Sequence, residues 1–350
     1  MNSRIWALTA ACALSGVRLA AQSTSEEGAP VGLQSHVVFT RYSSLSSAAE
    51  IIHRVLSPLE AQRVTQAASR GGKSLEGQPL DLTKERFSLY VPRRSPPQGY
   101  SLLVFVSPYD DARVPLDWIS TLDRHGMIFV TAARSGNTAN VFDRREPLAL
   151  LGAVNVVGRY AIDAQRVYVA GFSGGARVAE RLAIGYPELF RGGLLLAGSD
   201  PIGDAHLPLP PADVFARFQE SGRLVYASGS RDDYHLAEDA VSRQSMPKWC
   251  MFDIGGSSIP GLGHELPDGA ALDRLLDDLD APRFPNPEKL TECRAQLAAA
   301  LDAALRGVQD LAHAGRLGKA RDALGKLDAR FGGLAAPRSV ELADSLNTST

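Results

Sequence analysis

Between Arg166 and Gly175 the sequence reads RVYVAGFSGG. Its first half is an apolar run typical of a strand, and the small residues at 176–185 are typical of a helix. A G-x-S-x-G motif between a strand and a helix indicates a nucleophile elbow, a sharp turn that presents a serine hydroxyl. Side chains at Gly171 or Gly175 would collide with the neighbouring strand or helix. We therefore expect Ser173 to be a nucleophile at the edge of a sheet.

Other short apolar runs recur at a spacing that leaves room for a helix between them. They are Phe87–Val91, Leu102–Val106, Met127–Thr131, Val167–Ala170, Gly193–Ala197, Leu224–Ala227 and Trp249–Ile254. Such runs are typical of strands buried on both faces of a mostly parallel sheet. We expect the intervening helices at Leu116–Arg124, Glu146–Tyr160, Gly175–Gly185, Pro211–Glu220 and Leu236–Gln244. The alternation predicts a doubly wound α/β fold.

Helical periodicity also occurs outside this alternation. Residues 46–68 repeat apolar side chains at helical spacing, after a possible cap at Ser43 and Ser44, and predict a packing helix. Downstream, 287–306 and 317–331 each carry one apolar stripe, and Gly315 lies between them. We expect a C-terminal helical hairpin here.

The first residues resemble a secretory leader. Arg4 precedes a mostly apolar run, 5–17, and small residues at 20–21 offer a cleavage site. The run is shorter than the roughly 20 residues of a membrane-spanning helix. Cys12 suggests a lipidated variant, but the leucine expected three residues earlier is missing. We predict an exported protein, periplasmic or extracellular, with no integral membrane segment after processing.

These features divide the chain into four parts. We assign 1–21 to the signal peptide, 22–85 to an N-terminal linker and packing helix, 86–285 to the catalytic α/β domain, and 286–350 to a C-terminal helical extension.

Composition excludes some partners and leaves one question open. The formal charge of −2 provides no field to attract nucleic acid, and 45% hydrophobic residues are typical of a globular protein. Cys250 and Cys293 remain after the leader, and the sequence fits either a disulfide or a free buried pair.

A serine nucleophile needs a base and an acid that orients the base. In enzymes with a nucleophile elbow, the acid and then the histidine follow the serine along the chain. Asp232 follows the run 224–227, and His264 lies in a glycine-flanked loop after the run 249–254. Asp233 is an adjacent alternative for the acid. We expect three other histidines, His125, His206 and His235, to be structural or exposed.

From about Arg86 to Leu276 the chain resembles the secreted serine esterases of the α/β-hydrolase superfamily, including polyhydroxybutyrate depolymerase-like and feruloyl-esterase-like proteins. The resemblance rests on DAQRVYVAGFSGGA at 163–176, YPELF at 186–190 and GLGH at 261–264. It implies an α/β-hydrolase fold with Ser173 as nucleophile, His264 as base and Asp232 as acid. It implies neither a cofactor nor a metal.

The oxyanion loop departs from the relatives' pattern. Many relatives have a His-Gly or glycine-rich turn after the third strand, whereas Ser107–Asp111 here reads SPYDD. The resemblance implies the amide of Gly174 as one oxyanion donor and that of Tyr109 as the other, since Pro108 has no N–H. The two carboxylates would oppose a developing negative charge unless they point to solvent.

Three functions fit these residues. The first is hydrolysis of a small-molecule or polymeric carboxylic ester through an acyl-enzyme. The second is peptide hydrolysis by an enzyme similar to prolyl oligopeptidase, and the third is ligand or protein binding without catalysis. The sequence does not distinguish oligomeric states or substrates.

Overall fold

The computed structural model of this chain describes residues 29–203, 206–283 and 286–348. The predicted leader, 1–21, lies outside the described residues. Within the described residues, no helix is both long and apolar enough to cross a membrane.

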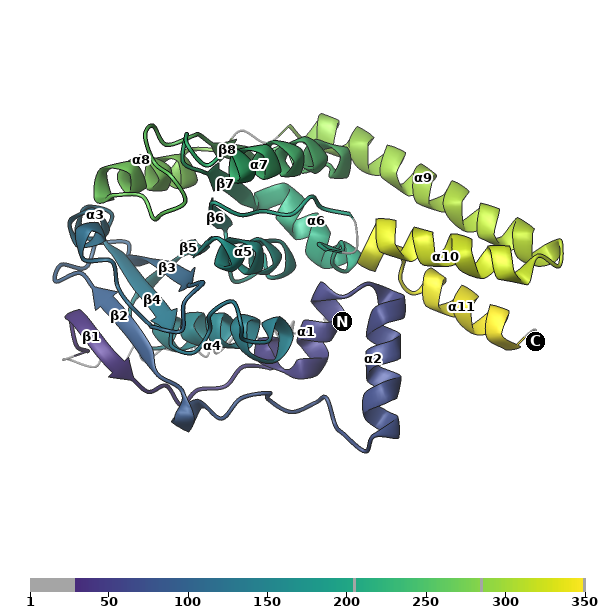
Figure 1. The fold of residues 1–350 in the computed structure, drawn as a ribbon, viewed down its shortest axis with the longest axis horizontal. Coiled ribbons are helices and arrows are strands. Elements are labelled where there is room, and N and C mark those ends of the chain that lie inside the picture. The colour runs from purple at the N-terminus through teal and green to yellow at the C-terminus, as the bar shows by residue number, and fades with distance from the viewer. Residues whose placement is uncertain (1–28, 204–205, 284–285, 349–350) are drawn as a thin grey trace, which may run out of the picture.

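An eight-stranded sheet forms the centre of the molecule, with the order β1-β2-β4-β3-β5-β6-β7-β8 (Figure 1). The pairs β1/β2 and β2/β4 are antiparallel, and the other pairs are parallel. The strands are β1 (Gly32–Val37), β2 (Phe87–Val91), β3 (Tyr100–Val106), β4 (Met127–Ala132), β5 (Ile162–Phe172), β6 (Gly192–Leu196), β7 (Arg223–Ala227) and β8 (Ile254–Gly256). This arrangement confirms the predicted mostly parallel, doubly wound sheet.

Helices cover both faces of the sheet (Figure 1). The body helices are α1 (Ala48–Val55), α2 (Pro58–Arg70), α3 (Ile119–Arg124), α4 (Glu146–Val157), α5 (Gly174–Gly185), α6 (Ala212–Ser221), α7 (Asp233–Ser245) and α8 (Gly269–Asp280). Successive residues of β3 point to opposite faces of the sheet. Val104 packs in the hydrophobic cluster that includes α4 and α5, and Phe105 packs in the cluster that includes α3 and α8. Because both faces are buried, the strands read as continuous apolar runs.

The segment before β2 differs from the prediction. A single helix over 46–68 is wrong, because the chain breaks between α1 and α2, where Ser57 adopts an extended conformation before Pro58. A residue before proline is disfavoured in the helical region, which explains the break. The α1 N-cap is Ser47, whose hydroxyl accepts from the Glu50 amide, not Ser43 or Ser44. The edge strand β1 was not predicted.

The predicted strand at Trp249–Ile254 is also largely wrong. Trp249 ends a 3-10 turn, Cys250 has a φ of 61°, and only Ile254 of this run belongs to β8. The Cys250 amide donates to the Pro247 carbonyl at 3.1 Å, so the apolar residues close a turn instead. Short apolar runs do not by themselves distinguish strands from other buried segments.

Three helices follow the body: α9 (Pro287–His313), α10 (Leu317–Phe331) and α11 (Arg338–Thr348). The first two form the predicted hairpin, and Gly315 between them has a φ of 71°. The apolar stripes join the core cluster of the body; for example, Phe331 meets Trp249 edge to face at 5.8 Å. A disulfide between Cys250 and Cys293 ties α9 to the body, which answers the question that the sequence left open.

Candidate active site

The strand β5 runs directly into α5 through the turn predicted as a nucleophile elbow. Ser173 has φ 55° and ψ −126°, a conformation that residues with a side chain rarely adopt. Its amide donates to the Leu196 carbonyl at 2.8 Å, which holds the turn against β6. The strained backbone places the hydroxyl at the carboxyl edge of the sheet.

The predicted need for glycine on both sides of the serine is confirmed. A Cβ atom at Gly171 would overlap the carbonyl oxygen of Gly175, and a Cβ atom at Gly175 would overlap the carbonyl oxygen of Val106. Because α5 and β3 approach these two positions so closely, only glycine leaves enough space for the backbone of the turn.

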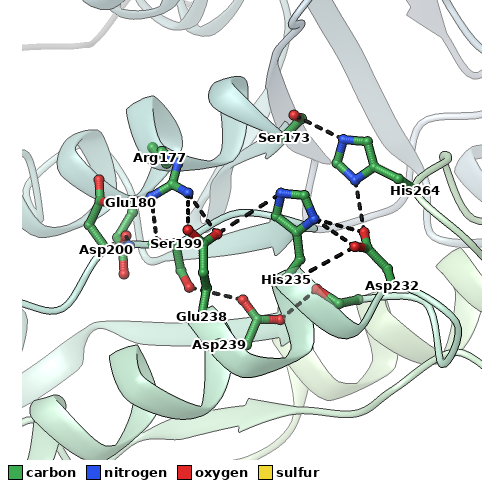
Figure 2. Close-up of polar contacts among 11 residues, drawn as sticks. Ser173, Arg177, Glu180, Ser199, Asp200, Asp232, His235, Glu238, Asp239 and His264 are labelled. Carbon is green, nitrogen blue, oxygen red and sulfur yellow. Dashed lines mark hydrogen bonds and ion pairs between the residues drawn. The ribbon is translucent and has the colours of Figure 1, made fainter.

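The structure brings together the three side chains expected to form a triad (Figure 2). His264 Nε2 lies 3.1 Å from Ser173 Oγ, and His264 Nδ1 lies 2.8 Å from Asp232 Oδ2. Asp232 follows β7 and His264 follows β8, as the chain order required. The alternative acid, Asp233, is the exposed first residue of α7.

One histidine that the sequence did not place in the site contacts two of the three expected triad residues. His235, expected to be structural or exposed, has its Nδ1 atom 2.8 Å from both carboxylate oxygens of Asp232. Its ring stacks on the His264 ring at 4.3 Å and 12°. Only its position one helical turn after Asp232 could have signalled this contact. Of the other two histidines, His125 lies 2.9 Å from Asp273.

The acid is held in its ionised form by its neighbours. Burial raises the pKa of Asp232, but hydrogen bonds from His235 and His264 outweigh it and leave the pKa below its usual value. A carboxylate at this position can therefore stabilise a protonated His264.

Buried acids behind the site behave differently. Burial raises the pKa of Asp239, whose carboxylate accepts from the hydroxyls of Ser228 and Ser199 at 2.7 and 2.9 Å. Burial raises the pKa of Glu146 to about 8, although the positive charges of Arg181 and Arg145 act in the opposite direction and lower it. Neither Glu146 carboxyl oxygen has a hydrogen-bond partner, which fits a protonated group.

The oxyanion donors are differently placed. Gly174 is the first residue of α5, so its amide lies at the positive end of that helix. The Tyr109 amide donates to Ser107 Oγ at 3.0 Å, and an oxyanion would have to displace this hydroxyl to use it. The carboxylates following Tyr109 are both exposed: Asp110 accepts from the Gly136 amide, and Asp111 pairs with a surface arginine.

Arg145 joins the segments around the expected oxyanion position, and no sequence motif indicates this role. It ends a π-helical turn, Val141–Arg145, and only 4% of it is exposed. Its guanidinium donates to the carbonyls of Ser135 at 2.9 Å, Ser107 at 3.0 Å and Gly174 at 3.2 Å. These bonds fix the loop after β3, the loop after β4 and the elbow relative to one another.

Two cavities lie beside the site. One, of about 580 Å³, opens next to Gly174 and is lined by charged side chains such as Arg177 and Glu238. The other, of about 470 Å³, has a mostly apolar wall that includes Tyr109 and Leu266. The first cavity includes Gly174, the residue after Ser173, and the second includes Leu266, two residues after His264.

Among the residues that the structure describes, one group of three metal-ligating side chains lies close together: Asp232, His235 and His264. Both histidines already contact Asp232 through Nδ1, and these hydrogen bonds account for their closeness. The cluster gives no separate reason to invoke a metal.

Residues 131–247 match the family model described as Esterase PHB depolymerase. This segment runs from β4 through the elbow to the helix after Asp232. The chain has an α/β-hydrolase fold. The conclusion rests on the sheet order, the strand-elbow-helix unit and the family match together.

Several solved structures resemble this chain, whereas no curated protein matches it in sequence. A poly(3-hydroxybutyrate) depolymerase from Bordetella parapertussis is 17% identical, with a TM-score of 0.42, over 60% of this chain and 88% of that one. A dipeptidyl peptidase 4 from Porphyromonas gingivalis is 16% identical, with a TM-score of 0.40, over 57% of this chain and 34% of that one. The chain thus spans about a third of that peptidase's length.

Proposed function

We propose that this α/β hydrolase cleaves carboxylic esters through an acyl-enzyme on Ser173. His264 takes the serine proton as Ser173 Oγ attacks the ester carbonyl, and Asp232 stabilises the imidazolium that forms. His264 then protonates the leaving alcohol. Water, activated by the same histidine, attacks the acyl-enzyme, releases the acid and restores Ser173.

The observation that carries this proposal is the continuous contact from Ser173 Oγ to His264 and on to Asp232, at 3.1 and 2.8 Å. A hydroxyl within hydrogen-bond distance of an oriented imidazole is the arrangement that nucleophilic catalysis by serine requires. The match to the esterase family model supports ester over peptide bonds.

The two cavities support an ester substrate with one apolar end and one polar end. We assign one end of the ester to the apolar cavity beside Tyr109 and the other to the charged cavity beside Gly174. The amide of Gly174 would donate to the oxyanion, and that of Tyr109 would join once Ser107 Oγ turns away.

Fluorophosphonate labelling followed by intact-protein mass spectrometry tests the nucleophile. We expect one adduct on the wild type and none on Ser173→Ala, while Ser120→Ala, at an exposed serine of α3, labels normally. A panel of esters and matched amides then tests the bond. Labelling that persists in Ser173→Ala, or faster cleavage of amides than of esters, contradicts the proposal.

We infer further that the protein is exported. The leader-like residues 1–21 and the Cys250–Cys293 disulfide both support this, since disulfides persist mainly in oxidising compartments. Mass spectrometry of protein from the native host should give an N-terminus near Gln22. Soluble cytoplasmic protein with an intact Met1 would contradict export.

A further inference from the structure

His235 lies in the first turn of α7 and faces the triad acid. Its side chain is 15% exposed, compared with 41% for His264. Figure 2 shows both imidazoles pointing toward the Asp232 carboxylate, His235 from the helix and His264 from the loop after β8. An ionised carboxylate has about four lone-pair positions, so Asp232 can accept from both rings.

The two rings also contact each other. Their centroids are 4.3 Å apart and their planes differ by 12°, so the His235 ring forms a flat support for His264. Phe172 also contacts the His264 ring, with the centroids 4.9 Å apart and the planes tilted by 31°. His264 thus contacts two rings, and one of them, His235, also holds Asp232.

Apart from Asp232 and Asp239, the charged groups around His235 form ion pairs with one another. On its own helix, Glu238 lies 4.0 Å from Nε2, and Tyr234 meets the ring edge to face at 4.9 Å. From α5, Arg177 donates to both oxygens of Glu238 at 2.6 and 2.7 Å and also pairs with Asp200. The buried Asp239 lies one residue beyond Glu238. Because Arg177 neutralises Glu238, the strongest acceptor left for His235 is Asp232.

We propose that His235 is a positioning residue: its Nδ1–H holds the Asp232 carboxylate so that one oxygen stays aimed at His264. This inference rests on the proposed ester hydrolysis. His264 must turn toward the leaving alcohol without losing its acid. Besides the two rings, the Asp232 carboxylate accepts from the His235 backbone amide, but this contact is long, at 3.5 Å to Oδ1. The shorter side-chain bonds from His235 Nδ1, at 2.8 Å to both oxygens, restrict rotation of the carboxylate and tie it to α7.

The proton on the His235 ring provides a test that does not depend on turnover. We expect NMR of wild-type protein with ¹⁵N-labelled histidine to show a proton on Nδ1 of both His235 and His264. Both signals should shift in Asp232→Asn. A proton on Nε2 of His235 instead of Nδ1 would overturn the proposal, even if labelling of Ser173 had already established the nucleophile.

Two variants separate the hydrogen bond from the ring contact. His235→Asn keeps an N–H donor near the Nδ1 position and loses the stack, whereas His235→Phe keeps the stack and loses the donor. Because a hydrogen bond to a charged group is lost, we expect kcat of the Phe variant to fall about tenfold or more, with little change in KM. The Asn variant should keep most of its activity.

The pH profile distinguishes positioning from a structural role. Without the His235 side-chain donor, the Asp232 carboxylate keeps only His264 and the long contact from the backbone amide of residue 235, so its negative charge stabilises protonated His264 more strongly. The acid side of the kcat/KM profile should therefore move to higher pH in His235→Phe. A purely structural role would change thermal stability without this movement.

His125→Phe and His125→Asn are matched controls, because His125 also contacts a carboxylate, that of Asp273, away from the site. We expect both to keep the wild-type kcat and pH profile. Wild-type kinetics for His235→Phe would overturn the proposal, as would equal losses in folded His235→Asn and His235→Phe. If neither variant folds, the NMR measurement on the wild type decides.

Discussion

Replacing Arg145 with lysine tests whether one buried guanidinium holds the oxyanion position. Arg145 donates to three carbonyls, and a lysine ammonium on a shorter reach can satisfy about one of them. Each carbonyl left without its donor costs about 1–3 kcal/mol, so the free energy of unfolding should fall by about 2–6 kcal/mol. A domain of this size usually has about 5–15 kcal/mol in total, so the variant should still fold.

Arg145→Lys should also lower kcat, and by more than a change in the fraction of folded enzyme would explain. The freed carbonyls belong to Ser107 and Gly174, which flank the expected oxyanion donors. Displacement of such groups by about 1 Å typically lowers the rate by about 100-fold, so we expect kcat to fall with KM nearly unchanged. Urea unfolding and steady-state kinetics measure the two effects separately.

The neighbouring arginine is the matched control. Arg144 lies in the same π-helical turn but donates to Glu85, at 3.1 and 2.5 Å, and to the Arg134 carbonyl. Arg144→Lys should lose stability and keep its kcat. An Arg145→Lys enzyme with wild-type kcat, or an equal loss of kcat in Arg144→Lys, would refute the reasoning.

Three further predictions concern the acid, the disulfide and a buried carboxyl group. Asp232→Asn should lower kcat by about 10⁴-fold, and Asp233→Asn should leave it nearly unchanged; steady-state kinetics with the reverse ranking would move the acid to Asp233. Replacing Cys250 and Cys293 with serine should lower the free energy of unfolding by about 4 kcal/mol for a 43-residue separation, measured by urea unfolding, and no loss would contradict the bridge. The pKa of Glu146 is raised from an ordinary 4.5 to about 8 in the folded state. Between these two pH values the folded state therefore keeps a proton that the unfolded state releases, so the free energy of unfolding should fall as the pH rises. Glu146→Gln should flatten that dependence in thermal unfolding, and an unchanged slope would show that Glu146 is ionised.

The parts of the site that the sequence predicted are those with a local pattern. Ser173 has a motif with strand and helix on either side, and the acid and histidine follow the next sheet strands in the required order. These three residues lie in loops at the carboxyl edge of the sheet, and both the order of the strands along the chain and the loops that follow them can be inferred from the apolar runs. The elbow glycines were predictable for the same reason, because their role depends only on backbone crowding.

The supporting contacts have no such pattern. Arg145 binds backbone carbonyls, and any residue supplies a carbonyl, so no side chain in the sequence indicates its partners. The position of His235 becomes informative only once α7 is known to begin at Asp233 rather than Leu236, since that places it one turn from Asp232. The break at Pro58 was visible in the sequence but was outweighed by the periodicity around it.

We infer that His264, the proposed base, is supported from two sides by different segments. Arg145 acts on the nucleophile side through Gly174, and His235 acts on the acid side through Asp232. We expect the 3.1 Å separation of Ser173 Oγ and His264 Nε2 to depend on both, because the elbow positions the hydroxyl and Asp232 positions the imidazole. Since these supports lie in different segments, a loop movement on one side alone is enough to separate nucleophile from base. Rigid backbone contacts on the elbow and a helix-borne donor on the acid therefore serve the same end, which is to keep that distance short in the free enzyme.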